Sequence, residues 1–224
     1  MSEINITIEG GTSKRLLTAG KYCDRDIVVT AEGGGASGDI DAFITRTITE
    51  IRSDVTTVGY YAFCNCADLV NVDFPNAVTI NGYGFQNCTA LTDVFFPKVS
   101  GINGYGFYGC TSLENADFPS LKSVGNYAFR KCSALKKIDM QQIYTINVYA
   151  FYECTNLETV ILRKTDGVCT LSATNVFQMT KISDGVGHIY VPAALVDSYK
   201  SQTNWSTYAA QIRAIEDYPE ITGG

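Results

Sequence analysis

Apolar residues return along this chain at a fixed spacing of 22 residues, and no residue is inserted or lost across five copies. The matching positions are Phe63, Phe85, Phe107, Phe129 and Phe151; Cys66, Cys88, Cys110, Cys132 and Cys154; Leu69, Leu91, Leu113, Leu135 and Leu157; Tyr61, Tyr83, Tyr105, Tyr127 and Tyr149; and Val58, Ile80, Ile102, Val124 and Ile146. A fixed period of this length is typical of a solenoid, in which each copy buries its apolar face against its neighbours.

The spacing of apolar residues changes within each copy, and this change predicts the local structure. The inward candidates of the central copy are Ile102, Phe107, Cys110, Leu113, Ala116, Phe118 and Leu121. Their last members alternate as in a half-buried strand. Pro75, Pro97 and Pro119 follow these strands, where no ladder hydrogen bond is needed. The Tyr-Ala/Gly-Phe triplet then predicts a compact helical or 3₁₀ return, so we expect stacked parallel strands on one face and irregular turns on the other.

Residues from about Val55 to Arg163 resemble the BspA-like (treponemal-type) leucine-rich repeat family, which occurs in bacterial surface proteins and phage-borne proteins. The shared features are a Cys, a Leu three residues later, a Val/Ile-x-Phe/Ile-Pro strand, an Ile-Gly turn and an Ala-Phe pair. The resemblance implies an α/β solenoid, a short right-handed stack of about five 22-residue repeats with parallel strands, irregular or 3₁₀ returns and caps at both ends. The Asn that follows the strand in commoner leucine-rich repeats is absent.

The pattern divides the chain into four parts. Residues 1–33 form a small β module, in which the alternation of Ile4, Ile6 and Ile8, a turn at Gly10-Gly11 and a second strand at 26–30 predict a hairpin. Residues 34–39 have the composition of a flexible linker. The solenoid covers 40–171, with regular repeats at about 55–164, and begins with an irregular rung whose core candidates are Ile44, Ile48 and Ile51. Residues 172–224 contain a degenerate repeat and the C-terminal cap.

The cap begins after a break in the spacing at 165–168, which moves the next phenylalanine to Phe177. The sequence then predicts a strand near 189–191, a helix that Pro192 opens and that ends at about Lys200, and a second helical or extended piece at 205–215. Trp205 and Tyr208 favour cap packing over a ligand site. We expect the C-terminal residues 219–224 to be loose.

Charge and hydropathy exclude several partners. The formal net charge of −6 argues against nucleic acid and anionic membranes. No apolar run approaches the length of a membrane span. The first residues contain neither the basic region nor the apolar region of a signal peptide, so we expect no classical secretion signal in this sequence.

Little in the sequence points to catalysis, a cofactor or a metal. The cysteine column predicts reduced, buried thiols that act as weak hydrogen-bond donors. Cys64-Asn65-Cys66 is a poor zinc candidate, because Cys66 belongs to the core column and Cys64 should point away from it. The G-x-G-x-x-G string at 104–109 lacks the strand and long helix of a nucleotide-binding turn. His188 is the only histidine. We therefore expect no enzyme activity.

The remaining candidate is a recognition surface on the strands. Its candidate residues are Asn71, Asp73, Asp93, Phe95, Asn115, Asp117, Lys137, Asp139 and Ile161. These positions vary between copies while the core positions do not, which suits a rigid scaffold that presents different side chains. Two alternatives stay open: the variation marks tolerant solvent positions, or a second varied column on the return side, Cys64, Gln86, Tyr108, Arg130 and Tyr152, is the binding face.

We therefore expect a non-catalytic module that binds protein or glycan. Residues 9–30 are similar to short modules in tail and other structural proteins of phages, which implies a tail-associated component of a virion that contacts a bacterial surface protein or glycan, or other virion proteins. The alternative is a BspA-like adhesin on the bacterial cell surface that engages host proteins, and an enzyme acting on surface polymers is a third. The N-terminal module could pair with another copy to form a homo-oligomer.

Overall fold

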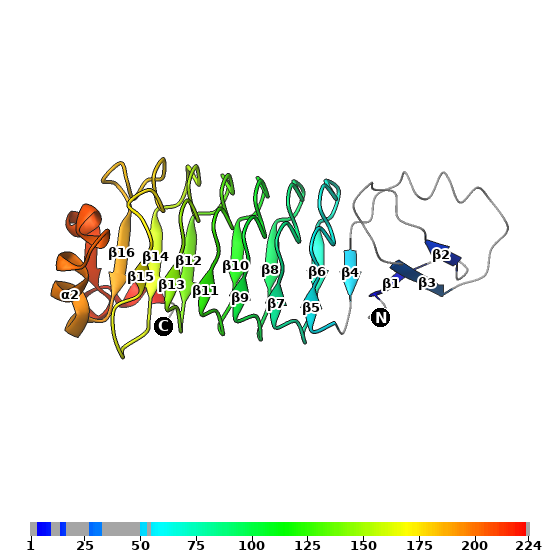
Figure 1. The fold of residues 1–224 in the computed structure, drawn as a ribbon, viewed down its shortest axis with the longest axis horizontal. Helices are drawn as coiled ribbons and strands as arrows, with labels where there is room; N and C mark the ends of the chain where they lie inside the picture. The colour runs from blue at the N-terminus through cyan, green and yellow to red at the C-terminus, as the bar shows by residue number, and fades with distance from the viewer. Residues whose placement is uncertain (1–3, 10–13, 17–26, 33–49, 53–54, 223–224) are drawn as a thin grey trace.

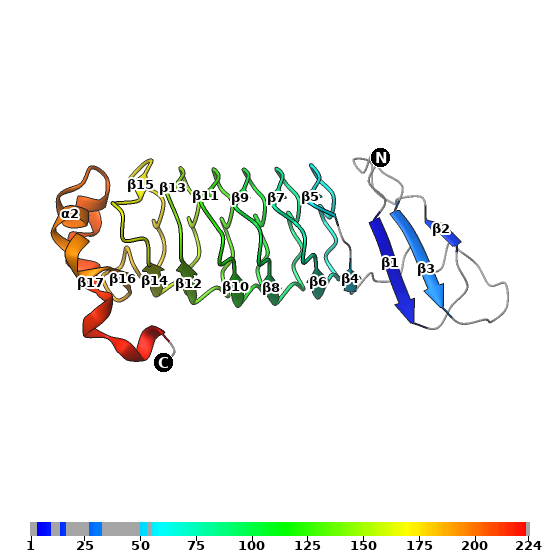
Figure 2. The same ribbon diagram turned by 90° about the horizontal axis from the view of Figure 1, so that it is seen from below.

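The protein is a stack of short repeats (Figure 1), and the computed structural model describes residues 4–9, 14–16, 27–32, 50–52 and 55–222. Successive repeats contribute one strand to each of two parallel sheets, which form opposite sides of the stack (Figure 2). In spatial order, the first sheet contains β8 (Asp93–Phe95), β10 (Asn115–Asp117), β12 (Lys137–Met140), β14 (Thr159–Leu162), β16 (His188–Val191) and β17 (Ile212–Ala214). The second contains β5 (Thr57–Val58), β7 (Thr79–Ile80), β9 (Gly101–Ile102), β11 (Ser123–Val124), β13 (Thr145–Ile146) and β15 (Thr170–Leu171). The predicted parallel solenoid is confirmed.

The core lies between the two sheets and follows the predicted columns. All seven inward candidates of the central repeat are buried. The phenylalanine column continues to Phe177, and successive rings stack with centroids 5.1 to 5.5 Å apart. Offset stacking adds to the area that each ring buries. Cys66, in the first regular repeat, differs from the rest of its column because it is only half-buried.

Each buried cysteine of the column is hydrogen-bonded to the backbone of the preceding repeat. The thiols of Cys88, Cys110, Cys132 and Cys154 donate to the carbonyl oxygens of Phe63, Phe85, Phe107 and Phe129, at Sγ–O distances of 2.9 to 3.2 Å. Burial raises the pKa of the Cys132 thiol, so the protonated donor is the stable form. The prediction of reduced, buried donors is confirmed for these four residues.

The returns are chains of turns and contain no helix. Along them, amides alternate between the next repeat and their own: Phe107 N donates to Ala128 O at 2.7 Å, and Tyr108 N donates to Tyr105 O at 3.2 Å. The tyrosine of each repeat has a positive φ of 57° to 63°, which interrupts any helical run. The tyrosine rings stack at 4.5 to 5.0 Å. The hydrogen bonds between residues i and i+3 that the predicted 3₁₀ return requires are present. The residues with a positive φ prevent these turns from joining into a continuous helix.

Gly125 lies where the backbones of two neighbouring repeats approach closely. A Cβ on Gly125 would lie 2.7 Å from backbone atoms of Asn103 and Gly104. Substitution Gly125→Ala is therefore expected to lower the free energy of unfolding by about 1–3 kcal/mol, the usual cost of overpacking. Gly101→Ala is the control, because its Cβ would meet only the Ser123 hydroxyl, at 3.3 Å. Urea denaturation measures both variants, and equal stability of the two would contradict the steric explanation.

The N-terminal strands are arranged differently from the prediction. β1 (Ile4–Glu9) pairs in parallel with β3 (Ile27–Glu32), and β2 (Lys14–Leu16) pairs antiparallel with β3. The predicted hairpin is wrong, because alternation identifies a strand but not the direction of its partner. Strand β4 (Glu50–Arg52) pairs in parallel with β6 (Asn71–Asp73). The turn at 10–11, the linker at 34–39 and the core candidates Ile44 and Ile48 lie outside the described residues, and the domain boundaries stay predictions.

The C-terminal cap closes the stack with short helical pieces. These are η1 (Ala193–Leu195), α2 (Val196–Ser201), η2 (Trp205–Gln211), η3 (Ile215–Asp217) and η4 (Pro219–Thr222). Trp205 and Tyr208 are buried against Phe177. The Trp205 indole N–H donates to Cys169 O at 2.6 Å, and the Tyr208 hydroxyl donates to Thr174 O. Both residues are cap packing, as predicted. Residues 219–222, which the sequence analysis expects to be loose, form η4.

Candidate functional site

The outward side chains of β6, β8, β10, β12 and β14 form one surface, here called the strand face. Its outer columns are set by the parallel pairing: Asp93 lies beside Asn115, Phe95 beside Asp117, and Asp117 beside Asp139. Of the predicted residues, Asn71, Asp73, Asp93, Phe95, Asn115, Asp117 and Lys137 are exposed. The sheet therefore brings most of the predicted residues together on one surface.

The exposed part of the strand face is acidic around one aromatic ring. Phe95 has 57% of its surface exposed, which is unusual for a large apolar side chain. Asn115 Nδ2 donates to Asp93 Oδ1 at 2.5 Å, and hydrogen bonds from Thr92 and Asn115 lower the pKa of Asp93. Partial burial and the neighbouring Asp139 raise the pKa of Asp117. The lowered pKa of Asp93 keeps its carboxyl group ionised at neutral pH.

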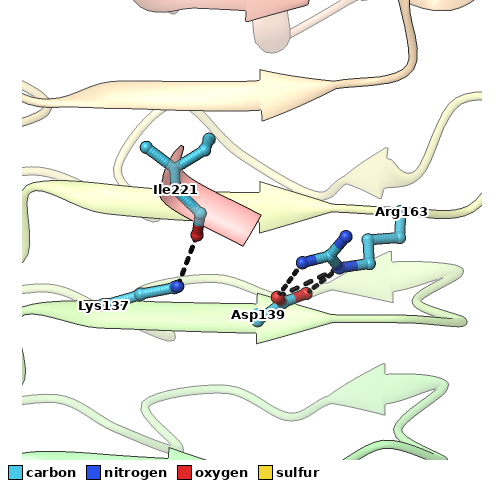
Figure 3. A network of polar contacts seen from close by, with 4 residues as sticks. All are labelled: Lys137, Asp139, Arg163 and Ile221. Carbon is cyan, nitrogen blue, oxygen red and sulfur yellow. Dashed lines mark hydrogen bonds and ion pairs between the residues drawn. The ribbon is translucent and has the colours of Figure 1, made fainter. Parts of the chain in front are cut away.

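The basic groups of the strand face are already bound within the protein (Figure 3). The Arg163 guanidinium forms a two-pronged ion pair with Asp139, with its Nη2 2.7 Å from Oδ2 and its Nε 2.8 Å from Oδ1. Lys137 Nζ donates to the carbonyl oxygen of Ile221 at 2.6 Å. Asp139 is consequently half-buried. Apart from Lys137, the predicted residues that remain exposed on the face are acidic, amide or aromatic.

Ile161 is not part of the exposed surface, and its prediction as an exposed apolar residue is wrong. Its side chain is 0% exposed. It lies between Asp139 on β12 and Tyr190 on β16. Alternation placed Ile161 outward, but the C-terminal tail passes over β14 (Figure 3). Tyr190, the next member of this column, was not among the predicted residues, although the alternation of 189–191 indicates that its side chain points outward.

The return-side column is a packed cluster of aromatic and charged side chains. The Arg130 guanidinium lies over the rings of Tyr108, Tyr127 and Tyr152 at 4.9 to 5.9 Å from their centroids, and its Nη2 is 3.2 Å from Glu153 Oε1. These groups are half-buried and contact each other. The charged groups and ring faces of this column contact each other and pack the repeats together. Fewer of its side chains are therefore available to bind a ligand than on the strand face.

The remaining chemical candidates do not assemble into a reactive site. His188 is half-buried on β16, where burial and the neighbouring Arg213 lower its pKa. Phe107, inside the G-x-G-x-x-G string, is in the core. Among the described residues, no group of three or more His, Cys, Asp or Glu side chains is placed to hold a metal ion. Within the same residues, no helix has the length and apolar character needed to cross a membrane.

Comparison with known proteins places the fold. Comparison with curated proteins gave no match. A leucine rich cell surface protein from Faecalibacterium prausnitzii A2-165 has a similar structure, with a TM-score of 0.55 and 23% sequence identity over 85% of this chain and 48% of its own. A leucine-rich repeat protein from Bacteroides ovatus ATCC 8483 has a TM-score of 0.43 and 20% identity, over 84% of this chain and 57% of its own. This chain thus spans about half the length of these two proteins.

The sequence profile of the BspA type Leucine rich repeat region matches in two overlapping segments, residues 42–98 and 78–188, with six copies of the repeat. The matched segments cover well over half of the chain and coincide with the stacked repeats. The chain therefore belongs to the BspA type leucine rich repeat family.

Proposed function

We propose that this protein is a non-catalytic recognition module of a bacterial cell surface that binds a protein partner through the strand face. The observation that carries the proposal is the exposure of Asp73, Asp93 and Asp117 around Phe95, while Lys137 and Arg163 are bound within the protein. Such a surface complements a partner segment that carries Lys or Arg next to an apolar residue. The sheet holds these side chains in place before binding, which reduces the entropy lost on association.

The cell-surface setting is favoured over a phage tail. The similar structure from Faecalibacterium prausnitzii is described as a cell surface protein. The phage hypothesis rests mainly on the resemblance of residues 9–30 to phage modules, and it gains no support from these comparisons. The proposed partner is a host protein, as in the adhesin hypothesis; a glycan is less suited to the exposed face, where Phe95 is the only large apolar side chain among the predicted residues that remain open.

The test is a triple variant of the strand face, Asp93→Asn, Phe95→Ala and Asp117→Asn. Binding of the protein to a panel of purified extracellular-matrix and serum proteins is measured by biolayer interferometry at two salt concentrations. The wild type is expected to bind a partner more weakly at high salt, because exposed charges are screened. The variant is expected to lose at least tenfold in affinity.

A matched control carries the same kind of changes on the cap: Asp184→Asn, Val186→Ala and Asp197→Asn. All three residues are exposed, and Val186 is 68% exposed. This control is expected to keep wild-type affinity. Unchanged binding of the strand-face variant, or an equal loss in both variants, would count against the strand face as the binding surface.

A further inference from the structure

The end of the chain turns back onto the strand face. After β17, η3 and η4 leave the cap and run outside the sheet that contains β14 and β16 (Figure 2). The carbonyl oxygen of Ile221 reaches the ammonium group of Lys137, 84 residues earlier in the chain. Figure 3 shows Ile221 in front of β14. We call residues 218–222 the tail.

The contacts of the tail with the face include a charged hydrogen bond, from Lys137 to the carbonyl of Ile221, and a pair of rings. The Tyr218 ring meets the Tyr190 ring at a centroid distance of 5.3 Å and an interplanar angle of 69°, an edge-to-face arrangement. Burial raises the pKa of Tyr190, and so do the neighbouring Tyr218 and Glu220. The tail thus brings an aromatic ring, a carboxylate and a main-chain carbonyl to this end of the strand face.

The covered part of the face is more apolar than the open part. Ile161 and Tyr190 lie side by side in the column that continues from Phe95 through Asp117 and Asp139. Both are buried, whereas Phe95 is exposed. Removing the tail would take away the ring that packs on Tyr190 and the carbonyl that binds the Lys137 ammonium group.

The tail is attached without being part of the sheet. Tyr218 N donates to Ile215 O in η3, and Ile221 N donates to Tyr218 O, so these backbone bonds close local turns and are not ladder bonds of the sheet. Glu220 is exposed, and Tyr218 and Ile221 are only half-buried. A segment held in this way can leave while the ladder of β12, β14 and β16 stays intact.

We propose that the tail is a displaceable occupant of the strand face, and that this end of the face binds a short peptide segment of a protein partner. The segment presents an aromatic ring to Tyr190 and a main-chain carbonyl to Lys137, as the tail does. The inference rests on the proposed function, because it extends the same recognition surface. A partner has to compete with the tail, so its apparent affinity falls with the fraction of molecules whose tail is bound.

The test uses the full chain and a synthetic, fluorescein-labelled peptide with the sequence of residues 215–224. Fluorescence anisotropy measures its binding to the wild type and to Tyr218→Ala, which weakens the attached tail and leaves Lys137, Ile161 and Tyr190 in place. The peptide is expected to bind Tyr218→Ala at least tenfold more tightly than the wild type. Equal affinity for the two proteins, or no binding to either, would overturn the proposal.

Two further substitutions in the Tyr218→Ala background test the contact itself. Lys137→Met is expected to reduce peptide affinity at least fivefold. Lys136→Met is the matched control and is expected to have no effect. This lysine is exposed and directly precedes β12, so the substitution removes the same kind of charge one residue away from Lys137. An equal effect of both substitutions would contradict docking at Lys137. The peptide experiment does not involve the surface partner, so its failure would leave the proposed function standing, and failure of the partner assay would leave tail docking standing.

Discussion

Replacing Phe107 with alanine is expected to lower the free energy of unfolding by about 3–5 kcal/mol, the usual cost of removing a buried aromatic ring. Phe107 is 0% exposed in the central repeat. Its ring stacks between Phe85, at 5.1 Å, and Phe129, at 5.3 Å, and meets the edges of Phe96 and Phe118. The cavity would interrupt the aromatic column at its middle, where both neighbouring repeats depend on it. Urea denaturation followed by circular dichroism measures the loss.

Phe95→Ala is the matched control for this experiment, because it removes the same side chain from the outer face. Phe95 is the residue just before the buried Phe96. Its substitution is expected to change stability by no more than about 0.5 kcal/mol, as for other surface positions. Similar losses in the two variants would contradict the assignment of inner and outer faces.

Trp205→Ala is expected to have a comparable effect at the end of the stack, about 3–5 kcal/mol. Trp205 is fully buried, and its ring packs edge-to-face against Tyr199 at 5.1 Å and beside Phe177 at 6.1 Å. The substitution also leaves the Cys169 carbonyl without its indole donor. Because terminal repeats of a solenoid need a cap, we expect the last repeats to lose protection from hydrogen exchange before the central ones do.

Trp205→Phe separates the two contributions. It keeps an aromatic ring in the cap and removes the N–H, so the expected loss is about 1–3 kcal/mol, the cost of an unsatisfied buried acceptor. Met179→Ala is the control in the same region, since Met179 is half exposed, and it is expected to change stability little. Uniform loss of exchange protection along the whole stack in Trp205→Ala would show that the cap does not act locally.

The solenoid could be predicted because residues of the same type recur every 22 positions in the sequence. In a stack of identical turns, residues 22 apart occupy equivalent positions, so the spacing of Phe85, Phe107 and Phe129 gives both the core column and its neighbours. The direction of pairing between β1 and β3 has no such signal, since alternation is the same in parallel and antiparallel strands. The left-handed tyrosines were also missed, because a non-glycine residue seldom has a positive φ.

The strand face was predictable as far as local alternation decides exposure. Asp73, Phe95 and Asp117 point outward as the pattern requires. Ile161 is buried although alternation places it outward. A segment later in the sequence, which contains Ile221, lies in front of its strand β14 (Figure 3), and nothing in the residues around Ile161 indicates this. The same segment accepts a hydrogen bond from Lys137, which keeps its positive charge but directs its ammonium group toward Ile221.

The central claim is that the repeats form a rigid scaffold whose recognition depends on exposed side chains of the strand face and not on its core. The most direct measurement follows partner affinity and melting temperature on the same samples of the wild type and the variant Asp93→Asn/Phe95→Ala/Asp117→Asn. The account predicts that affinity falls at least tenfold while the melting temperature stays within about 2 °C, because surface changes rarely exceed 0.5 kcal/mol. A variant that keeps its affinity, or loses it only together with its folded structure, would contradict the account.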